Sequence, residues 1–254
     1  VNLQYQAAAY RMRLPVHFLP HICRAIRKPL VVTFHDLRVP YLFPKAGRLR
    51  HWVVRLLLTA SAGVIVTNEE DKNAIDGIVP AENSSLVRIG SNIAPVQRSQ
   101  ERRAQLRAEW GASEADLVIS YFGFLNASKG ALDLVRALAL LKGAGVPAIL
   151  VFIGGTVGAS DPTNAAYAQN VQAEIAKLGL QGSVRFTGFQ PAAEVSHSLY
   201  ASDLCALPYR DGVSLRRGTL MAALAHGLPI VTTAPGVPIP SLKHGQNVFL
   251  VPPA

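Results

Sequence analysis

Short apolar runs alternate with amphipathic segments through the first third of the chain. Three of these runs, at residues 30–34, 63–67 and 86–89, consist mainly of Val, Ile, Leu and other apolar residues. Runs of this length and composition predict buried strands. The segments at residues 45–60 and 69–77 have helical spacing, and residues 1–6 indicate the end of a further strand. Strands that alternate with helices predict a parallel sheet with right-handed crossovers.

The same alternation continues beyond residues 90–100, where the pattern lapses around Pro95 and predicts a linker. Strands are predicted at residues 117–122, 148–153, 183–186, 204–207 and 229–233, and helices at residues 100–110, 131–143, 165–178, 192–201 and 219–226. The chain therefore divides into two similar Rossmann-like halves, residues 1–92 and residues 95–254. We expect each half to be a doubly wound α/β domain with a parallel sheet, and the two to face each other across a cleft.

Length and composition favour a globular protein without a transmembrane span. Half of the 254 residues are hydrophobic, yet no apolar run is as long as the roughly 18 residues of a candidate spanning helix. Cys23 and Cys205 have no partner pattern, so we expect neither a disulfide framework nor a metal site. A reducing, cytoplasmic setting is therefore predicted. The chain starts at Val1 without an initiator Met, which predicts that the amino-terminal domain is incomplete.

The positive charge of the chain is concentrated near its start. The formal net charge is +9, and the first 60 residues contain ten Lys or Arg but only one acid, Asp36. No zinc spacing, helix-turn-helix pattern or interleaved aromatic residues accompany this charge, so a nucleic-acid partner is not expected. An anionic acceptor or an anionic lipid surface is the favoured partner.

The segment from Lys45 to Ala60 places basic and aliphatic residues on opposite sides of a predicted helix. Arg48 and Arg55 lie on the basic side with Trp52 nearby, a combination typical of helices at a membrane interface. One hypothesis is that the protein docks peripherally on the inner face of a membrane. The alternative is a helix whose aliphatic side packs on the sheet while its basic side is only solvated.

Candidate chemistry concentrates between Pro208 and Thr233, where a strand opens into a polar loop and a helix follows. Gly227 stands where a C-cap glycine would end that helix. A loop that enters a helix at the carboxyl edge of a sheet presents free N–H groups and the positive end of the helix dipole. Arg216 and Arg217 add two permanent cations there. The stretch therefore predicts a site for a phosphate or a diphosphate.

The segment AHGLPIV at residues 225–231 resembles the end of the last signature of the GT-B glycosyltransferases of family 4. Counting back from Gly227, the two glutamates of that signature fall at Ser214 and Ala222, so both carboxylates are absent. In the family, the first glutamate contacts the donor sugar and the second contacts the nucleotide ribose. Asp211 is the only nearby carboxylate that could take over such a role, in a loop that the resemblance places over the sugar.

A second loop, from Gly123 to Gly130, lies between a predicted strand and a predicted helix, as a phosphate loop does. It lacks the Gly-Lys-Ser/Thr of a P-loop, because Lys129 precedes the glycine. It resembles the family 4 segment in which an Arg and a Lys-Gly pair grip the donor diphosphate, although Phe124 stands at the Arg position. The alternative is a solvated loop lysine.

Two further segments extend the resemblance. Residues 33–36 match the Thr-x-His-Asp of the family, whose histidine reaches the donor sugar from across the cleft. His35 could therefore hydrogen-bond a sugar hydroxyl or stabilise developing charge, with Asp36 orienting its ring. The alternative is a histidine satisfied by Asp36 and the backbone. Gly188 and Phe189 resemble a turn that lies against the nucleotide base, and a purely structural turn is equally compatible with them.

The resemblance covers nearly the whole chain and implies a truncated GT-B glycosyltransferase. Such an enzyme moves a sugar from a nucleoside diphosphate sugar to a glycan or lipid-linked acceptor, in cell-envelope or polysaccharide biosynthesis. The resemblance implies retention at the anomeric carbon. It also implies that Lys129, Arg216 and Arg217 stabilise the departing diphosphate in place of a metal ion.

Two other classes of function stay open. One is a non-catalytic nucleotide-sugar-binding or regulatory protein on the same scaffold, because a fold does not fix a function. The other is a different nucleotide-binding α/β protein such as a dehydrogenase. The absence of a Gly-x-Gly-x-x-Gly fingerprint followed by an acidic residue disfavours this last class.

Overall fold

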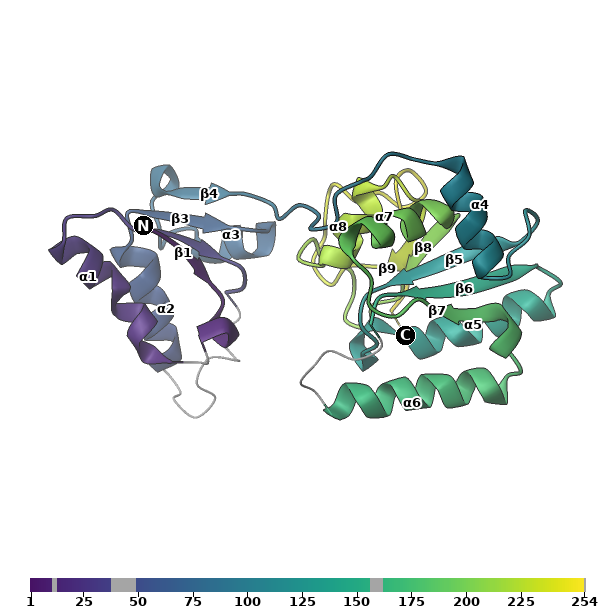
Figure 1. Ribbon diagram of the computed structural model, residues 1–254. Helices are drawn as coiled ribbons and strands as arrows, with labels where there is room; N and C mark the ends of the chain where they lie inside the picture. The colour runs from purple at the N-terminus through teal and green to yellow at the C-terminus, as the bar shows by residue number, and fades with distance from the viewer. Residues whose placement is uncertain (11–12, 38–48, 156–161, 254) are drawn as a thin grey trace. The chain divides into compact units, whose positions relative to one another are not determined.

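A computed structural model describes residues 1–10, 13–37, 49–155 and 162–253 of the chain. The chain forms two compact units, Val1–Ile89 and Gly90–Ala254 (Figure 1). The division at Gly90 coincides with the start of the stretch where the sequence pattern lapses. Each unit contains one parallel sheet, which confirms the predicted α/β class with two parallel-sheet domains.

The first unit is built on a four-stranded parallel sheet in the order β1-β2-β3-β4. Its strands are β1 (Asn2–Tyr5), β2 (Val31–Phe34), β3 (Gly63–Val66) and β4 (Ser84–Leu86). Its helices are α1 (Leu19–Ala25), α2 (Leu49–Ala60) and α3 (Glu69–Ile75), with the 3-10 turns η1 (Ala7–Tyr10), η2 (Leu14–Phe18) and η4 (Ala81–Asn83). The predicted strand at residues 86–89 is wrong in position, because backbone groups of the polar Ser84 and Ser85 make the ladder with β3.

Helix α2 packs its aliphatic side into the first unit and exposes its other side. Val53 and Leu57 are fully buried in the core that also contains the strand residues Val32 and Phe34. Trp52 is 51% exposed and Arg55 is exposed as well. The packing of the aliphatic side agrees with the alternative interpretation of this helix. The start of the predicted helix, including Arg48, lies outside the described residues.

The second unit is built on a six-stranded parallel sheet in the order β10-β9-β8-β5-β6-β7. Its strands are β5 (Leu117–Phe122), β6 (Ala148–Ile153), β7 (Val184–Phe186), β8 (Leu204–Leu207), β9 (Ile230–Thr233) and β10 (Phe249–Val251). Its helices are α4 (Gln100–Glu109), α5 (Ala131–Gly143), α6 (Pro162–Lys177), α7 (Ala192–Ala201) and α8 (Gly218–Ala225), with the 3-10 turns η5 (Ala127–Lys129) and η6 (Gln181–Ser183). The pattern does not predict β10, because three apolar residues on an edge strand are too few to show a period.

Helices cover both faces of the second sheet (Figure 1). Helices α5 and α6 pack on one face, where Leu134 and Tyr167 join the core. Helices α4, α7 and α8 pack on the other face, where Leu106, Leu199 and Ala222 join a second core. All six residues of β6 are buried, as expected for a parallel strand covered on both faces. This arrangement is the doubly wound one that the sequence predicts.

The order of the strands reverses at β5. From β5 the chain adds β6 and β7 on one side of the sheet and β8, β9 and β10 on the other. Doubly wound sheets bind their ligands outside the carboxyl ends of the strands at such a reversal. The loops that leave β5 and β8 are therefore placed where a ligand is expected.

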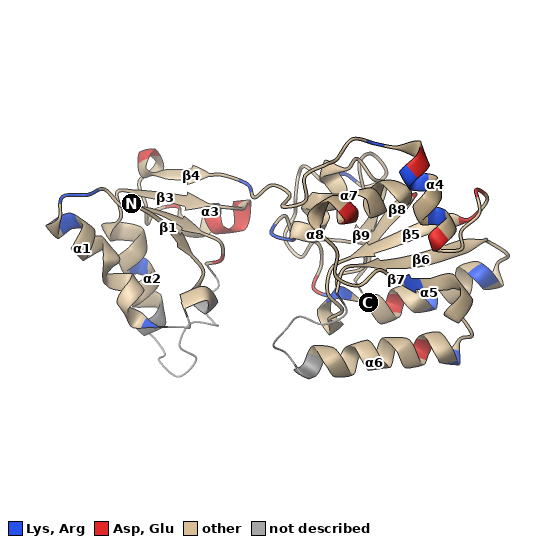
Figure 2. Ribbon diagram, in the orientation of Figure 1, with Lys and Arg blue, Asp and Glu red and all other residues tan. Residues whose placement is uncertain are grey.

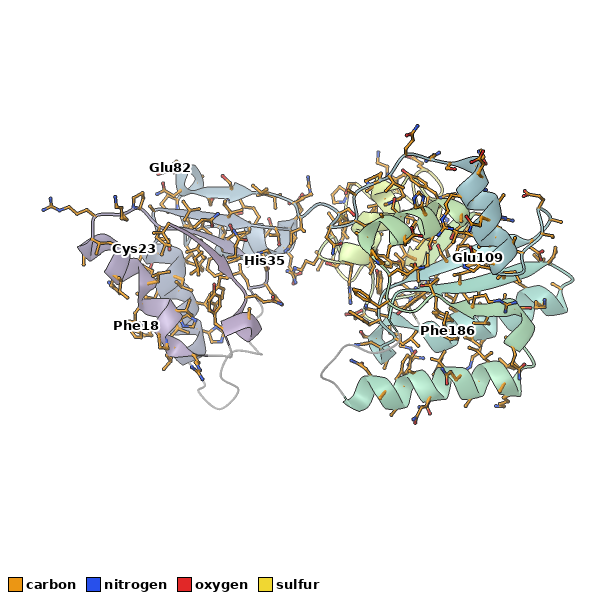
Figure 3. The ribbon with its side chains drawn as sticks, viewed as in Figure 1. Phe18, Cys23, His35, Glu82, Glu109 and Phe186 are labelled. Atoms are coloured by element: carbon orange, nitrogen blue, oxygen red, sulfur yellow. The ribbon has the colours of Figure 1, made fainter. Side chains whose placement is uncertain are left out.

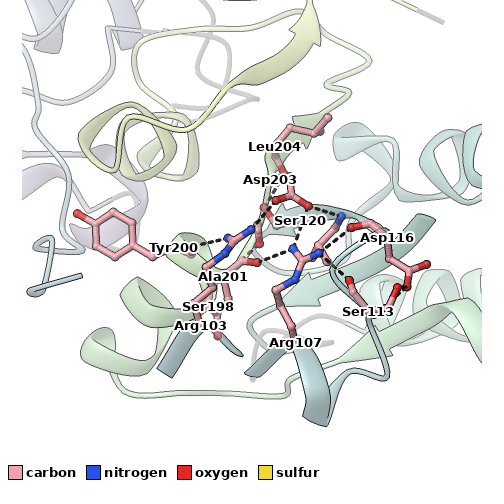
Figure 4. Close-up of polar contacts among 12 residues, drawn as sticks. Arg103, Arg107, Ser113, Asp116, Ser120, Ser198, Tyr200, Ala201, Asp203 and Leu204 are labelled. Carbon is pink, nitrogen blue, oxygen red and sulfur yellow. Dashed lines mark hydrogen bonds and ion pairs between the residues drawn. The ribbon is translucent and has the colours of Figure 1, made fainter. Parts of the chain in front are cut away.

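The opposite edge of this sheet, at the amino ends of the strands, is held by an ionic network (Figure 4). Asp203 lies directly before β8 and pairs with Arg103 at 2.7 Å and with Arg107 at 2.9 Å. Asp203 Oδ2 also accepts a hydrogen bond of 2.7 Å from the N–H of Val118 in β5. Arg107 is only 2% exposed. The network therefore fastens α4 to the two central strands at the edge away from the ligand loops.

Candidate functional site

Two loops meet at the carboxyl ends of β5 and β8, one at residues 123–130 and the other at residues 208–217. Gly130 has a φ of +66°, and a Cβ there would lie 2.1 Å from the carbonyl oxygen of Pro208. Only glycine permits this approach, since it has no Cβ and tolerates a positive φ. The Arg210 N–H also donates a hydrogen bond of 2.8 Å to the carbonyl oxygen of Ser128. The two loops therefore form one continuous surface.

An ion pair fixes the second loop to the helix that follows the first loop. Arg210 donates to the carboxylate of Asp133 through Nε and Nη2, each at 3.0 Å. Asp133 lies in the first turn of α5. A bidentate pair of this kind adds geometric specificity to its energy. The pair therefore orients the loop at residues 208–217 relative to α5.

The ammonium group of Lys129 lies against Gly123 rather than out in solvent. A Cβ at Gly123 would be 3.0 Å from Lys129 Nζ and 3.0 Å from Thr219 Cγ2, so the group lies between the end of β5 and the start of α8. Burial lowers the pKa of Lys129, and the nearby charge of Arg217 lowers it further. This placement does not fit the alternative of a solvated loop lysine.

Arg217 is held in place by two neighbours. Its guanidinium carbon lies 4.6 Å from the centroid of the Tyr209 ring, and its Nη2 pairs with the carboxylate of Asp211. The ring of Tyr209 is itself fixed, because its hydroxyl lies 2.6 Å from Thr219 Oγ1 and its side chain is 1% exposed. Burial raises the pKa of the Tyr209 hydroxyl, so it stays neutral. Arg217 is therefore positioned next to the start of α8 before any ligand arrives.

Ser214 shapes the turn that leads into α8. Its carbonyl accepts a hydrogen bond from the Arg217 N–H at 3.0 Å, and its Oγ accepts one from the Arg216 N–H at 3.3 Å. Among the described residues, no side chain caps the start of α8. The first N–H groups of α8 and the guanidinium of Arg217 therefore lie close together, and Arg216 directly precedes them in the chain. This is the arrangement that binds anions at helix N-termini.

Neither position of the two family glutamates offers a carboxylate in this structure. Ser214 uses its hydroxyl in the turn just described, and Ala222 is fully buried in the core beneath α8. Asp211 does carry a carboxylate in the loop, but that group is paired with Arg217. The role of Asp211 as a substitute for a lost glutamate stays a prediction.

The turn after β7 reaches the same edge of the sheet. Gly154, directly after β6, forms an isolated antiparallel bridge with Gly188, and its N–H donates to Thr187 Oγ1 at 3.1 Å. A Cβ at Gly154 would lie 3.6 Å from the carbonyl oxygen of Gly123. Phe189 follows this turn and is 86% exposed. An exposed aromatic face is therefore available beside the two loops.

His35 and Asp36 belong to the first unit, directly after β2. His35 Nε2 lies 2.8 Å from Gln4 Oε1, within hydrogen-bonding distance, and the backbone N–H of His35 donates to the Tyr5 carbonyl at 3.0 Å. The ring is thus held by β1, a contact that the sequence does not predict. Figure 3 labels His35 at this end of the sheet. Its role toward a donor sugar stays a prediction.

Sequence reasoning missed several residues that hold the site together. Thr219, Asp133, Arg210 and Gly154 all belong to this group. Arg210 and Asp133 are 77 residues apart, so only the fold brings them together. The sequence does contain a signal for the turns at Gly123 and Gly154, because each glycine follows directly on a buried strand. Both glycines have a positive φ angle. Over the described ranges, no cluster of three or more His, Cys, Asp or Glu could hold a metal ion.

The chain resembles known glycosyltransferases in sequence and in fold. EpsD of Bacillus subtilis (strain 168), a protein named as a glycosyltransferase, is 28% identical to this chain over 221 residues. The match covers 82% of this chain and 54% of EpsD. The crystal structure of Anabaena Alr3699/HepE in complex with UDP has a TM-score of 0.75 at 23% identity and covers 94% of this chain. The sucrose-phosphate synthase of Thermosynechococcus elongatus has a TM-score of 0.66 at 20% identity and covers 99% of this chain.

The likeness to these structures shows that the fold is that of the GT-B glycosyltransferases. The chain spans about half the length of EpsD and 62% of the length of HepE. A family model described as "Glycosyl transferases group 1" matches residues 102–254, which contain both loops. The chain therefore belongs to the group 1 glycosyl transferases.

Proposed function

We propose that the protein transfers a sugar from a nucleoside diphosphate sugar to a hydroxyl group of an acceptor. One observation carries the proposal: the Lys129 ammonium and the Arg217 guanidinium lie beside the uncapped start of α8, where the order of the sheet reverses. Fixed cations and oriented N–H groups stabilise a diphosphate as it becomes a leaving group. Family membership supports transfer of a glycosyl unit rather than another use of a diphosphate site.

In the proposed reaction, the bond between the anomeric carbon and the diphosphate oxygen breaks with its electron pair going to the diphosphate. The acceptor oxygen then bonds to the anomeric carbon, and its proton passes to the departing diphosphate. Lys129 and the arginines stabilise the charge that develops on the leaving group. His35, with Asp36, stabilises the sugar from the first unit, and the product retains the anomeric configuration of the donor.

A uridine diphosphate sugar is the donor to test first. HepE, which shares the fold, has been crystallised with UDP and with UDP-glucose. Phe189 supports a nucleotide here, because its exposed ring gives a base a surface to stack on. The bridge between Gly188 and Gly154, which lies beside Gly123, supports this assignment. We assign the base to Phe189 and the diphosphate to the two loops.

We also propose that the cations replace a metal ion, and that the acceptor is a glycan or a lipid-linked sugar used in envelope or polysaccharide synthesis. A cytoplasmic protein held at the inner membrane face would meet such acceptors. The excess of basic residues in the first unit supports that location. Nucleic acid is not proposed as a partner.

A second candidate is a nucleotide-sugar-binding protein without transferase activity. The absence of a carboxylate at Ser214 and Ala222 favours it, since no acidic group is available there to hold the donor sugar. Binding of the nucleotide would then persist, because Lys129 and the two arginines are unaffected.

The deciding experiment incubates the protein at its natural length with UDP-sugars and an acceptor in the presence of EDTA. Calorimetry measures binding, and mass spectrometry measures released UDP and the glycosylated product. Transfer in EDTA supports the proposal, and the anomeric proton coupling of the product tests retention. Binding of UDP without release or transfer would establish the second candidate. No binding of any nucleoside diphosphate would reject both.

A further inference from the structure

The carboxylate of Asp211 occupies a guanidinium that the proposed diphosphate site needs. Asp211 Oδ2 pairs with Arg217 Nη2, and the side chains of Asp211 and Arg217 are 50% and 24% exposed, respectively. Arg217 is the N-cap residue of α8, so the pair lies beside the first free N–H groups of that helix. The chain therefore places an anion of its own where an anionic ligand is expected.

Two cations lie close together at this place, and Asp211 balances one of them. Burial lowers the pKa of Lys129, and the charge of Arg217 lowers it further, as expected for two cations that repel each other. In Figure 2 the ribbon of α8 carries neither acidic nor basic residues, in agreement with its sequence GTLMAALA. The balancing carboxylate thus comes from the loop before α8. A diphosphate would balance the same cations, because its oxygens also accept charge-assisted hydrogen bonds.

The backbone next to Asp211 is fixed, whereas its side chain is half exposed. The Gly212 N–H donates to the Tyr209 carbonyl at 3.1 Å, which closes a turn around Asp211. A Cβ at Gly212 would lie 2.7 Å from the carbonyl oxygen of Ala234, so the chain is packed closely there. Rotation of the Asp211 side chain to another rotamer can therefore break the pair without moving the loop.

Arg217 does not depend on Asp211 alone for its position. Its guanidinium carbon lies 4.6 Å from the centroid of the Tyr209 ring, and that ring is 1% exposed. A cation over the face of an aromatic ring is attracted to it whether or not a carboxylate is present. Arg217 is therefore expected to stay at the start of α8 when its anionic partner changes.

We propose that Asp211 competes with the diphosphate for Arg217. The carboxylate holds the guanidinium before a ligand binds, yields it to a phosphate of the ligand, and takes it back as the diphosphate leaves. The inference rests on the proposed function, because it concerns the regulation of that same site. A carboxylate beside a diphosphate weakens its binding by repulsion between like charges. Weaker binding of a diphosphate product speeds its release, a step that limits the rate of many enzymes.

Two other roles for Asp211 predict different results. If the carboxylate only held Arg217 in place, its loss would weaken the binding of UDP. If it replaced the glutamate that is absent at Ser214, its loss would weaken the binding of UDP-glucose more than that of UDP. Competition instead predicts tighter binding of both, and of inorganic pyrophosphate, because the repulsion acts on the phosphates.

The test is a calorimetric titration of the protein at its natural length with pyrophosphate, UDP and UDP-glucose at low salt. Asp211→Asn is nearly isosteric, and Asn is well tolerated in turns. It should bind all three ligands roughly 5- to 20-fold more tightly than the wild type, and high salt should reduce the difference. Glu174→Gln is the matched control, since this carboxylate on α6 also pairs with an arginine, Arg136, at 2.8 Å. It should bind as the wild type does.

Two further variants separate competition from a general effect of charge. Asp211→Glu keeps the carboxylate and should show no gain in affinity. Arg217→Gln removes the group for which the two anions compete, so most of the gain from Asp211→Asn should be lost in that background. Stopped-flow measurement should show slower dissociation of UDP from Asp211→Asn than from the wild type. A purely structural role for Asp211 would not produce tighter binding together with slower release.

Unchanged or weaker pyrophosphate binding by Asp211→Asn would overturn the proposal. So would an equal gain in the Arg217→Gln background, or a loss confined to UDP-glucose, because that loss assigns Asp211 to the donor sugar. The failure of the proposed function is a separate result. Tighter pyrophosphate binding by Asp211→Asn without any binding of UDP or UDP-sugars removes the donor and keeps this inference, whereas sugar transfer from UDP-glucose without the gain removes only this inference.

Discussion

Lys129 and Arg216 act at the proposed diphosphate site from different loops, one after β5 and one before α8. Replacing either by Ala should weaken UDP binding by about 1.5–3 kcal/mol, the range for hydrogen bonds to charged groups. Uridine has no phosphates and should bind the variants and the wild type equally. Calorimetric titrations with both ligands measure the difference, with Lys142→Ala as the control. Equal losses for uridine and UDP would remove the phosphate assignment.

Gly130 tests whether the two loops touch as described. In Gly130→Ala the new methyl group would meet the Pro208 carbonyl, and the positive φ would add strain. Gly179 has nearly the same φ, +67°, but a Cβ there would meet no atom within 4 Å beyond its chain neighbours. Gly179→Ala therefore introduces the backbone strain of a positive φ without a steric clash. We expect about 1 kcal/mol of destabilisation at Gly179 and about 1–3 kcal/mol more at Gly130. Urea unfolding measures both. Equal values would mean that the loops do not touch.

At the scale of elements, the network around Asp203 should determine how firmly α4 is joined to the sheet. Asp203→Ala removes three hydrogen bonds and leaves Arg107 buried without its carboxylate. The expected loss is about 3 kcal/mol in the free energy of unfolding. Glu109→Ala, which removes a half-exposed carboxylate 3.7 Å from Arg102, should cost less than about 1 kcal/mol. A loss at Asp203 as small as that at Glu109 would show that the network contributes little.

The same network predicts part of the acid sensitivity of the fold. Burial alone would raise the pKa of Asp203, but hydrogen bonds from the Val118 N–H, Arg103 and Arg107 outweigh it and hold the pKa below its usual range. The stability that the Asp203 carboxylate contributes is therefore fully present at pH values above the pKa of Asp203 in the unfolded chain. It is lost as the pH falls through the lower pKa of the folded state.

His226, at the end of α8, predicts a second pH effect at milder acidity. It is 2% exposed, with Nε2 2.7 Å from Ser196 Oγ and Nδ1 2.7 Å from the Ala222 carbonyl. Burial lowers the pKa of His226 from 6.5, against an opposing effect of the hydrogen bond to Ala222. The unfolded chain then takes up a proton at a higher pH than the folded chain. The free energy of unfolding should therefore fall as the pH drops below 6.5.

Unfolding of the second unit can be followed by Trp110, which is 6% exposed, in a Trp52→Phe background. His226→Gln should flatten the dependence on pH between about 7 and 5. His21→Gln, at an exposed histidine of the first unit, should leave it unchanged. An unchanged slope in the His226 variant would show that this residue is not the titrating group.

At the scale of the whole molecule, the two units are expected to divide binding from transfer. All the proposed diphosphate and base contacts lie in residues 90–254, whereas His35 lies in the first unit. His35→Ala should therefore leave UDP affinity within about twofold of the wild type and lower kcat by about 10²-fold or more, the usual loss for an electrostatic stabiliser. Calorimetry and a transfer assay measure the two quantities. Unchanged kcat would remove His35 from the reaction.

The prediction from sequence was good where the local pattern is strong. Strands such as Leu117–Phe122 and Ala148–Ile153 have the bounds that their apolar runs predict, because a strand buried on both faces must be apolar throughout. The pattern failed at β4 and β10, where short edge or polar strands depend on a neighbouring ladder for their place. The parallel arrangement followed from alternation with helices. The reversal at β5 did not, because strand order is decided by long-range pairing.

The sequence by itself determined the fold class, the two loops and the cations that they carry. These features depend on neighbours in the chain: apolar runs make strands, glycines allow turns, and Lys129 and Arg216 lie in the loops that follow two of the strands. Only the tertiary structure showed that Lys129 lies against Gly123, that Arg210 pairs with Asp133, and that Arg217 rests on Tyr209. Contacts between distant residues require the folded chain, because their free energy appears only when packing brings the groups together.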